Sequence, residues 1–441
     1  MQKKGFSKKT IGMFAVALVL CLGVVFVVSC YQPRQPEETS NCSGSNMLPV
    51  PDDLAELGPY PVASRYVYVT NPNIPRINPY SGKPFRVQIL YPTTEAAVAG
   101  MTTKELSIED IKWYLPDVTA GDKTPPTFQA DWYELPDEDL YDNDREDSHF
   151  LPIDSTHGPY PVIFMVHGTS SSTTSHYTLI PHWASRGFVV IMADYHGINM
   201  RDMLENIATF ELKTELPDTR FLVDAVKAQN GVFSMLKGHI DTSRMGVAGH
   251  SWGGSVAGYM AGTKGIKVSI PMASIGVSPS PEIETALVMG AKWDAVLNYQ
   301  IDTVKGYEAT QARKRLVGIP RAGHMAYADV CDIVLLADAY GVKLDAFVKA
   351  MATDGCNDPD DPNPKYIDQL LSREIMKYAT TGAFEETLQC MPSSGQALDN
   401  IKSHFSNVPD LEFRQSEATP NNTNRMPRIE EGLFRRFPKT D

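Results

Sequence analysis

Residues 249–253 read Gly-His-Ser-Trp-Gly, a Gly-x-Ser-x-Gly pentapeptide centred on Ser251. The apolar residues 245–248 before it predict a strand, and the small and apolar residues 256–260 after it predict a helix. A strand that turns into a helix this tightly strains the middle residue, and flanking glycines remove side chains that would collide there. The pattern therefore predicts that the Ser251 hydroxyl stands at the edge of a sheet, where it could act as a nucleophile. A buried serine in an ordinary strand-to-helix turn is the structural alternative.

Ser251 would need two partners for such chemistry, because a serine hydroxyl is a weak nucleophile at neutral pH. A histidine must take its proton, and a carboxylate must orient that histidine. After a strand-turn-helix serine, the acid and then the histidine follow along the chain, each just beyond a later strand. Asp294 follows the predicted strand 286–290, and His324 follows the predicted strand 314–319. We predict Asp294 as the acid and His324 as the base.

Other acidic and histidine residues are less well placed for these roles. Asp329, five residues after His324, and Asp194, at the end of an earlier strand, are the alternatives for the acid, although structural roles suit both better. His250 lies inside the pentapeptide, where packing or capping suits it better than catalysis. The other histidines lie in polar loops, in the tail or before the serine: His149, His157, His167, His176, His182, His196, His239 and His404.

Acyl transfer also requires two hydrogen-bond donors aimed at the oxygen that becomes negative, each worth about 3 kcal/mol. The backbone N–H of Trp252, directly after Ser251 and at a helix N-terminus, is the first candidate. The second is the N–H of Thr169, in the loop that follows the predicted strand 162–166. His167 in the same loop could be mistaken for a base, and we expect it to shape the loop by a hydrogen bond.

The elements that must position these residues alternate between strands and helices from residue 161 onward. Strands are predicted at 161–166, 187–193, 245–248, 266–272, 286–290 and 314–319, and helices at 177–186, 217–236, 256–260 and 370–388. This alternation predicts an α/β fold with a mostly parallel central sheet flanked by helices. Residues 66–69 and 85–91, with turn residues between them, predict an antiparallel pair ahead of it. The connection 273–285 is too short to hold a lid domain.

Composition divides the remainder of the chain. We predict a signal peptide over 1–29, a flexible tether over 30–59, a folded domain over 60–390 with insertions at 93–157 and 331–366, and a partly disordered C-terminal extension over 391–441. The carboxylate-rich stretch 131–147 within the first insertion suits a solvated loop.

The N-terminus has the layout of an export signal. Four lysines precede an uncharged apolar run over 11–28, and Val-Val-Ser-Cys at 27–30 resembles the bacterial lipobox, with Cys30 as the lipidated residue. An uncleaved signal anchor is the alternative, because the run is nearly long enough to span a bilayer. Both interpretations put the rest of the protein outside the cytoplasm. Tyr31 after the lipid site, rather than Asp, favours the outer membrane or cell surface.

Charge and cysteine content fit an exported protein that does not bind nucleic acid. The formal net charge of −13 argues against a polyanionic partner. An even number of cysteines follows the predicted lipid site, namely Cys42, Cys331, Cys356 and Cys390. They allow two disulfides in any of three pairings. A zinc site is the alternative, although no pair has Cys-x-x-Cys spacing.

Several segments carry a resemblance to a known family. The sequence of 161–168, the stretch 183–190, Gly-His-Ser-Trp-Gly-Gly at 249–254 and Gly-His at 323–324 look like the α/β-hydrolase family. Within it, the pattern is most similar to the branch of dienelactone-hydrolase-like enzymes, platelet-activating-factor acetylhydrolases and cutinase-like polyester hydrolases. The resemblance covers roughly residues 60–388 with two interruptions.

This resemblance implies a carboxylic ester hydrolase with Ser251 as nucleophile, His324 as base and acid, and Asp294 as its partner. It also implies donors at Thr169 and Trp252. The chain differs from the polyester hydrolases in having Thr169 where they place an aromatic residue, and in both insertions. These differences weaken the case for a polymeric substrate.

The sequence therefore predicts an exported serine esterase that works through an acyl-enzyme and needs no metal or organic cofactor. Its expected partners are a small-molecule or lipid-like ester and, through the N-terminal lipid, a membrane. A phospholipid acetylhydrolase, amidase or thioesterase could use the same three residues. A non-catalytic surface lipoprotein that keeps this fold as a binding scaffold is the alternative from another class.

Overall fold

The structure is a computed structural model, and it describes residues 46–74, 80–107, 110, 126–135, 150–204, 215–342, 346–358 and 361–419. The predicted signal peptide, Cys30 and Cys42 lie outside these residues. Among the helices within the described ranges, none is both long and apolar enough to cross a bilayer.

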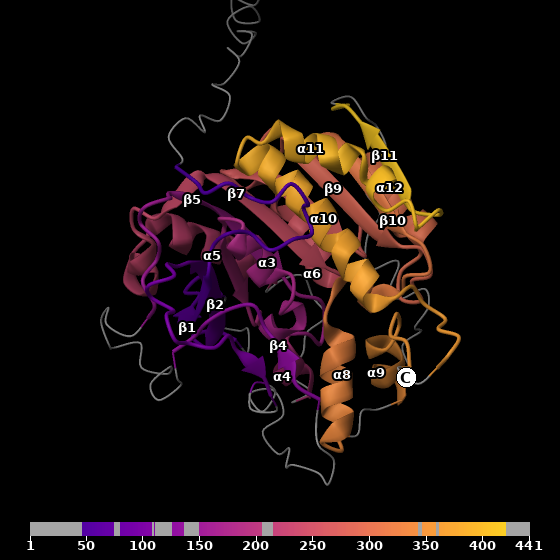
Figure 1. Cartoon of the computed structure of the whole chain (residues 1–441), viewed down its shortest axis with the longest axis horizontal. Helices are drawn as coiled ribbons and strands as arrows, with labels where there is room; N and C mark the ends of the chain where they lie inside the picture. Colours follow the sequence, from indigo (N-terminus) through magenta and orange to yellow (C-terminus); the bar gives the residue numbers. More distant parts are fainter. Residues whose placement is uncertain are drawn as a thin grey trace, which may run out of the picture. The chain divides into compact units, whose positions relative to one another are not determined.

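One large sheet occupies the centre of the described residues, with strand order β1-β2-β6-β5-β7-β8-β9-β10-β11 (Figure 1). The strands are β1 Val62–Thr70, β2 Pro84–Pro92, β5 Tyr160–Val166, β6 Val189–Ala193, β7 Ile240–His250, β8 Ile266–Met272, β9 Thr285–Ala291, β10 Arg313–Ile319 and β11 Glu412–Ser416. Neighbours from β6 to β10 in this order are parallel, whereas β1–β2, β2–β6 and β10–β11 are antiparallel. This confirms the predicted fold class, and the 273–284 connection between β8 and β9 holds no lid domain.

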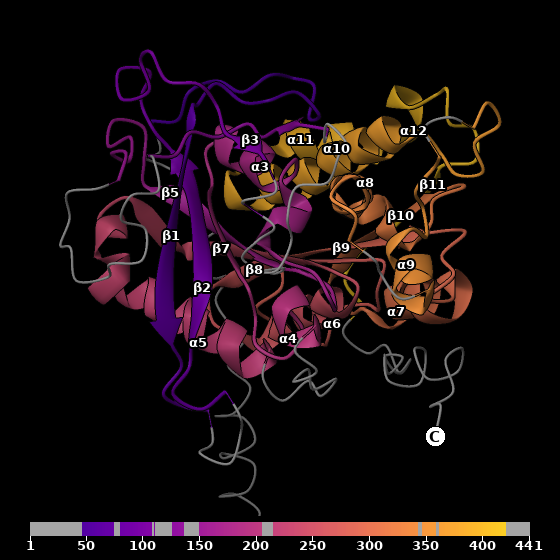
Figure 2. The same ribbon diagram turned by 90° about the horizontal axis from the view of Figure 1, so that it is seen from below.

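Helices cover both faces of this sheet. They are α3 Ile180–Ser185, α4 Met200–Leu204, α5 Glu215–Ala228, α6 Trp252–Tyr259, α7 Lys305–Ala309, α8 Val330–Ala339, α9 Ala346–Ala352, α10 Gln369–Leu388, α11 Pro392–Asp399 and α12 Ile401–His404. Short 3-10 helices span Thr173–His176, Gly231–Leu236, Met260–Gly262 and His324–Tyr327, and a π-helical turn spans Tyr299–Val304. Figure 2 shows α3, α10 and α11 on one side of the sheet and α5 and α6 on the other.

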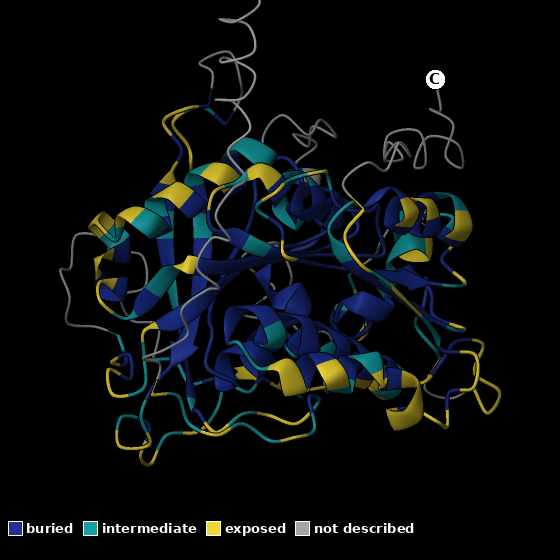
Figure 3. Cartoon of the chain, turned by 90° about the horizontal axis from the view of Figure 1, so that it is seen from above, coloured by how far each residue is buried: buried dark blue, intermediate teal, exposed yellow. Residues whose placement is uncertain are grey.

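The central strand β5 shows why these strands appear as continuous apolar runs in the sequence. Ile163 and Met165 pack into the core that includes residues of α3 and α10, whereas Phe164 and Val166 pack into the core that includes residues of α5 and α6. Both faces of β5 are therefore buried, and Figure 3 shows the central strands in dark blue between the helices. A strand covered on both sides needs no polar alternation.

The predicted helix 217–236 is interrupted. Helix α5 ends at Ala228, and a separate 3-10 helix begins at Gly231. Gln229 has a φ of 48° and Gly231 a φ of 54°, in the left-handed region that ends a helix. Apolar residues continue across the break, so periodicity alone did not reveal it.

Residues 46–59 are not a flexible tether, contrary to the predicted boundary. Leu54 is 2% exposed and packs in the α3 and α10 core, which stabilises the fold by about 2 kcal/mol. The guanidinium of Arg186 donates to the carbonyls of Pro51, Asp53 and Glu56. These partners lie far along the chain from Arg186, so local composition could not show the contact.

The described C-terminal residues also belong to the domain, beyond the predicted end at 390. Strand β11 pairs with β10, which otherwise would expose its backbone N–H and C=O groups as an open edge. Leu398 and Ile401 of the adjoining helices are buried in the main core. Polar residues predominate in 391–416, so composition did not place this segment in the folded domain.

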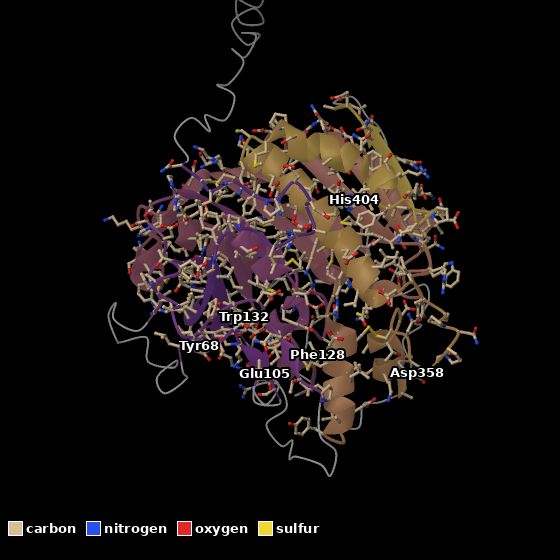
Figure 4. All side chains as sticks on the ribbon, in the orientation of Figure 1. Tyr68, Glu105, Phe128, Trp132, Asp358 and His404 are labelled. Carbon is tan, nitrogen blue, oxygen red and sulfur yellow. A yellow bond between two sulfur atoms is a disulfide. The ribbon has the colours of Figure 1, made fainter. Side chains whose placement is uncertain are left out.

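The first insertion, 93–157, is anchored to the domain where it is described. Strands β3 Glu105–Leu106 and β4 Phe128–Gln129 pair with each other (Figure 4). Trp132, only 1% exposed, packs in the α3 and α10 core. Tyr133 exchanges backbone hydrogen bonds with β1. Most of the carboxylate-rich stretch lies outside the described residues.

The second insertion, 331–366, contains α8 and α9 and is closed by a disulfide between Cys331 and Cys356. This is one of the pairings that the sequence allowed. Cys390 is disulfide-bonded as well.

Candidate active site

Ser251 lies in the turn between β7 and α6, with φ 56° and ψ −120°. This strained conformation persists because the surrounding structure requires it. A Cβ atom at Gly249 would collide with the carbonyl of Gly253, and one at Gly253 would collide with the carbonyl of Val166. The glycines of the pentapeptide thus permit the close approach of β7, α6 and β5 that produces the sharp turn.

Ser251, His324 and Asp294 form a hydrogen-bonded row. The Ser251 hydroxyl lies 2.8 Å from His324 Nε2, and His324 Nδ1 lies 2.7 Å from Asp294 Oδ2. In this arrangement Nδ1–H donates to the carboxylate, which leaves Nε2 free to accept the serine proton. The other carboxylate oxygen, Oδ1, accepts the N–H groups of Val296 and Leu297. The structure therefore brings together the three side chains that the sequence selected.

The sheet topology explains why residues so far apart in sequence meet. Ser251 follows β7, Asp294 follows β9 and His324 follows β10, each just past the carboxyl end of its strand. Because β7, β8, β9 and β10 are parallel neighbours, these ends share one edge of the sheet. The site is built at this edge, where loops can present side chains without disturbing the sheet.

The electrostatics around His324 favour its protonated form. Burial opposes protonation, but the carboxylate of Asp294 and, more weakly, that of Asp354 outweigh this effect and raise the pKa of His324 above its ordinary value. The neighbouring histidines differ, because burial lowers the pKa of His176 to about 3 and that of His250 well below its usual range. His324 is therefore the ring of this group best suited to exchange a proton near neutral pH.

The loop after β5 lies beside the serine, as expected for a source of oxyanion donors. A Cβ atom built on Gly168 would lie 3.1 Å from Ser251 Cβ, so this backbone passes directly next to the nucleophile. Thr169 follows in the same loop, and Trp252 is the first residue of α6. The first N–H groups of a helix have no partner within the helix, which leaves that of Trp252 available to a ligand.

His167 uses both ring nitrogens within this loop. Nδ1 donates to the Gly168 carbonyl at 2.8 Å, and Nε2 accepts the N–H of Tyr195 at 3.2 Å. Burial lowers the pKa of His167, which favours a neutral ring that holds the loop by these two hydrogen bonds. This geometry agrees with the predicted role in shaping the loop.

The two alternative acids bind elsewhere. Asp194 accepts from Arg86 at 2.9 Å, whereas Asp329 forms an ion pair with Arg373 at 2.9 Å and accepts the N–H of Thr178. Both carboxylates are committed to structural partners, as the sequence analysis favoured.

Sequence reasoning missed one residue at the site, and it expected only packing or capping of a second. Asp354 Oδ2 accepts the backbone N–H of His324 at 2.8 Å, and His250 Nε2 donates to the His324 carbonyl at 2.9 Å. Position 250, between the pentapeptide glycine and the serine, was a signal that this histidine lies close to the site. Nothing in the sequence marked Asp354, which lies inside an insertion.

Comparison with known proteins points to the same fold. The model of the chlorophyllase family matches residues 145–305, which contain Ser251 and Asp294. A solved structure of a ferulic acid esterase from Streptomyces cinnamoneus is similar, with a TM-score of 0.50 and 16% identity, covering 75% of this chain and 91% of that chain. The chain has an α/β-hydrolase fold. No curated protein matches the sequence significantly.

The family match spans residues 145–305, and the similarity to the solved structure, at 16% identity, concerns the fold. The His324 position lies beyond the matched segment, so its assignment depends on the geometry described above. Within the described residues, no group of three or more His, Cys, Asp or Glu side chains could hold a metal ion.

Proposed function

We propose that this protein is a serine esterase that hydrolyses carboxylic esters through an acyl-enzyme. The observation that carries the proposal is the hydrogen-bonded row of Asp294, His324 and Ser251 behind a strained strand-to-helix turn. This geometry supplies a nucleophile, a base within hydrogen-bonding distance and a carboxylate that orients the base.

The first half-reaction transfers the acyl group. Ser251 Oγ attacks the ester carbonyl carbon while its proton passes to His324 Nε2, and the ionised Asp294 stabilises the resulting imidazolium. The N–H groups of Thr169 and Trp252 donate to the tetrahedral oxyanion. Collapse of this intermediate breaks the bond to the leaving oxygen, which takes the proton from Nε2 and departs as the alcohol.

The second half-reaction releases the acid. Water gives a proton to His324 Nε2 and attacks the acyl-enzyme carbonyl, and a second tetrahedral intermediate forms in the same donor site. The carboxylic acid leaves when the bond to Ser251 Oγ breaks and the serine regains its proton. The same base therefore serves both steps.

A serine-directed fluorophosphonate and an ester substrate test this proposal. We expect the reagent to modify Ser251 and to abolish ester hydrolysis in proportion, and Ser251→Ala to lose both labelling and activity. Ser243→Ala is the matched control, because Ser243 is an exposed serine on the same strand, β7. Hydrolysis that survives in Ser251→Ala, or a wild-type protein that resists the reagent, would contradict the proposal and favour the scaffold alternative.

A substrate panel separates the esterase from other acyl hydrolases that use the same residues. It should contain matched ester, thioester and amide forms of one acyl group, a series of acyl lengths, an acetylated phospholipid, a feruloyl ester and chlorophyll. We expect the ester of the matched set to have the highest kcat/KM. Preference for the amide, the thioester or the phospholipid would assign the corresponding alternative.

We also propose that the enzyme is exported and anchored by a lipid at Cys30, in the outer membrane or at the cell surface. The support is the lysine-rich start, the apolar run and the lipobox-like sequence. A disulfide between Cys331 and Cys356 also suits an oxidising compartment. In Cys30→Ser, we expect a labelled fatty acid no longer to be incorporated and the protein to leave the membrane fraction. Cys21→Ser should still carry the lipid.

A further inference from the structure

We propose that Asp354 is a positioning residue. It holds the loop after β9, which carries Asp294, and the loop after β10, which carries His324, in one fixed arrangement. The proposal rests on the esterase function above and deepens it by assigning a residue that does not touch the substrate. The proposal rests on the contacts that the second insertion, 331–366, makes with the loop that carries His324.

One oxygen of Asp354 joins both loops. Oδ2 accepts the backbone N–H of His324 at 2.8 Å and that of Ala295 at 2.9 Å. Ala295 directly follows Asp294, so a single atom bridges the loop after β9 and the loop after β10. Two N–H donors on one ionised oxygen give short, directional contacts that fix the separation of the loops.

The rest of Asp354 is also committed. Oδ1 accepts the Tyr366 hydroxyl at 2.8 Å, and the Asp354 carbonyl accepts the N–H of Met325 at 2.7 Å. The side chain is buried, with 5% exposed. The carboxylate therefore has one orientation, and its backbone is held against the turn that carries His324.

The local backbone is adapted to this close approach. Gly355 has a φ of 110°, and a Cβ atom on Gly323 would collide with the Gly355 backbone. Cys356, the next residue, is tied to Cys331 by the disulfide. Glycine at both contact positions and a cross-link beside them bring a distant segment to the catalytic loop and keep it there.

His324 is consequently held on both sides of its backbone. Asp354 binds its N–H, and His250 Nε2 binds its carbonyl at 2.9 Å. A displacement of the base by about 1 Å can cost about 100-fold in rate. Fixing the backbone at both ends limits such displacement while leaving the ring free to exchange protons with Ser251.

Asp354 also contributes charge. The groups that face His324 are Asp294, Asp354, the Ser251 hydroxyl and the neutral His250 ring. Burial lowers the pKa of His324, and both carboxylates raise it. Since the base must be neutral, removing the Asp354 charge should move the acidic limb of the rate profile to lower pH.

The test separates hydrogen bonding from charge. Asp354→Asn keeps an acceptor oxygen but removes the charge, Asp354→Ala removes both, and Tyr366→Phe removes the hydroxyl that donates to Asp354 Oδ1 and accepts from Lys365 Nζ. Asp361→Asn is the matched control, because Asp361 is an exposed carboxylate in the same insertion. For each protein we would measure kcat, KM and the single-turnover rate of fluorophosphonate labelling across pH, together with Tm.

We expect Asp354→Ala to lower kcat and the labelling rate by up to about 100-fold with little change in KM. Asp354→Asn should lose less and should shift the acidic limb to lower pH. Tyr366→Phe should lose activity without moving the limb, and Asp361→Asn should match the wild type. If Asp354→Ala fails to fold, the pH of the acidic limb in the rate profile of Asp354→Asn tests the proposal.

A lowered Tm with an unmoved limb and an unchanged kcat in Asp354→Asn would overturn the proposal and leave a purely structural role. The NMR titration of the His324 Nδ1–H resonance provides a readout that needs no substrate, and Asp354→Asn should shift its midpoint to lower pH. If wild-type Ser251 neither reacts nor supports hydrolysis, the esterase proposal fails while this titration still decides the role of Asp354. If the wild type reacts and the Asp354 variants equal it in rate and titration, only the positioning role fails.

Discussion

The Arg186–Glu385 ion pair and the His324–Asp294 pair are both buried, but they differ in how much bonding capacity remains. Arg186 Nε lies 2.6 Å from Glu385 Oε1, and both side chains are fully buried. The other Arg186 donors bind three backbone carbonyls of residues 51–56, and Glu385 Oε2 accepts from Ser394. Each guanidinium nitrogen of Arg186 and each carboxylate oxygen of Glu385 therefore has a hydrogen-bond partner.

The His324–Asp294 pair keeps one position open to chemistry. Asp294 is saturated by His324 and two backbone N–H groups, but His324 Nε2 faces only the Ser251 hydroxyl. That hydrogen bond can pass a proton in either direction, whereas the guanidinium of Arg186 cannot give one up. The fully bonded pair stabilises the fold, whereas the pair with one exchangeable position suits the proton transfer that we propose.

The largest expected effect follows from breaking the His324–Asp294 pair. Asp294→Asn should lower kcat by about 10⁴-fold, because the amide favours the wrong tautomer of His324. Steady-state kinetics and Tm measure this change, and Tm should fall little. Asp194→Asn is the comparison, and a larger loss of kcat there than in Asp294→Asn would move the acid role.

Breaking the structural pair should act on stability instead. Glu385→Gln leaves Arg186 buried without its counter-ion and should lower the free energy of unfolding by about 3–5 kcal/mol. Denaturant titration measures the loss, and the kcat of the folded protein should stay near the wild-type value. A large drop in kcat without a loss of stability would erase the distinction between the two pairs.

The disulfide of the second insertion should have a smaller effect on stability. Replacing Cys331 and Cys356 together by serine opens a loop with a sequence separation of 25 residues. Loop entropy predicts a loss of about 3 kcal/mol. We also expect a lower kcat, because this cross-link lies beside Asp354. An unchanged kcat with reduced stability would mean that the disulfide stabilises the fold, as the Arg186–Glu385 pair does, and does not position the site.

The smallest expected effect concerns the dependence of kcat/KM on pH. It also distinguishes the His324–Asp294 pair from the Arg186–Glu385 pair. The pKa of His324 is raised above its ordinary value, so kcat/KM should increase with pH through that pKa and then level off. The limb should stay in place in Glu385→Gln, because neither Arg186 nor Glu385 is among the groups that shift the pKa of His324. Measurements of kcat/KM from acid to mildly basic pH test both statements.

Parts of this fold were predictable because their signals are local. Continuous apolar runs indicated the strands between helices, and the pentapeptide indicated the turn at Ser251. The order of Asp294 and His324 after the serine follows from a parallel sheet, whose strand ends share one edge. Asp329 and Asp194 were also carboxylates near strand ends, and only their partners Arg373 and Arg86 removed them from the site.

Other parts were hidden because they depend on contacts between distant residues. The Pro-, Ser-, Glu- and Asn-rich composition of 31–51 suggested a tether that lasts to residue 59, yet the carbonyls of Pro51, Asp53 and Glu56 accept hydrogen bonds from Arg186. Strand β11 pairs with the edge of β10, although Phe413 is the one apolar residue in 412–416. Asp354 lies in an insertion, and its role emerges only where that segment folds back to His324.

By itself, the sequence determined the parallel strands from β5 to β10 and the order of the residues that could perform chemistry, because hydrophobic periodicity and turn residues act over a few positions. The tertiary structure decided which carboxylates are committed to arginines and which one orients His324. It also decided that a disulfide-closed insertion supplies the oxygen joining both catalytic loops. These outcomes depend on through-space hydrogen bonds and burial, which exist only once the chain has folded.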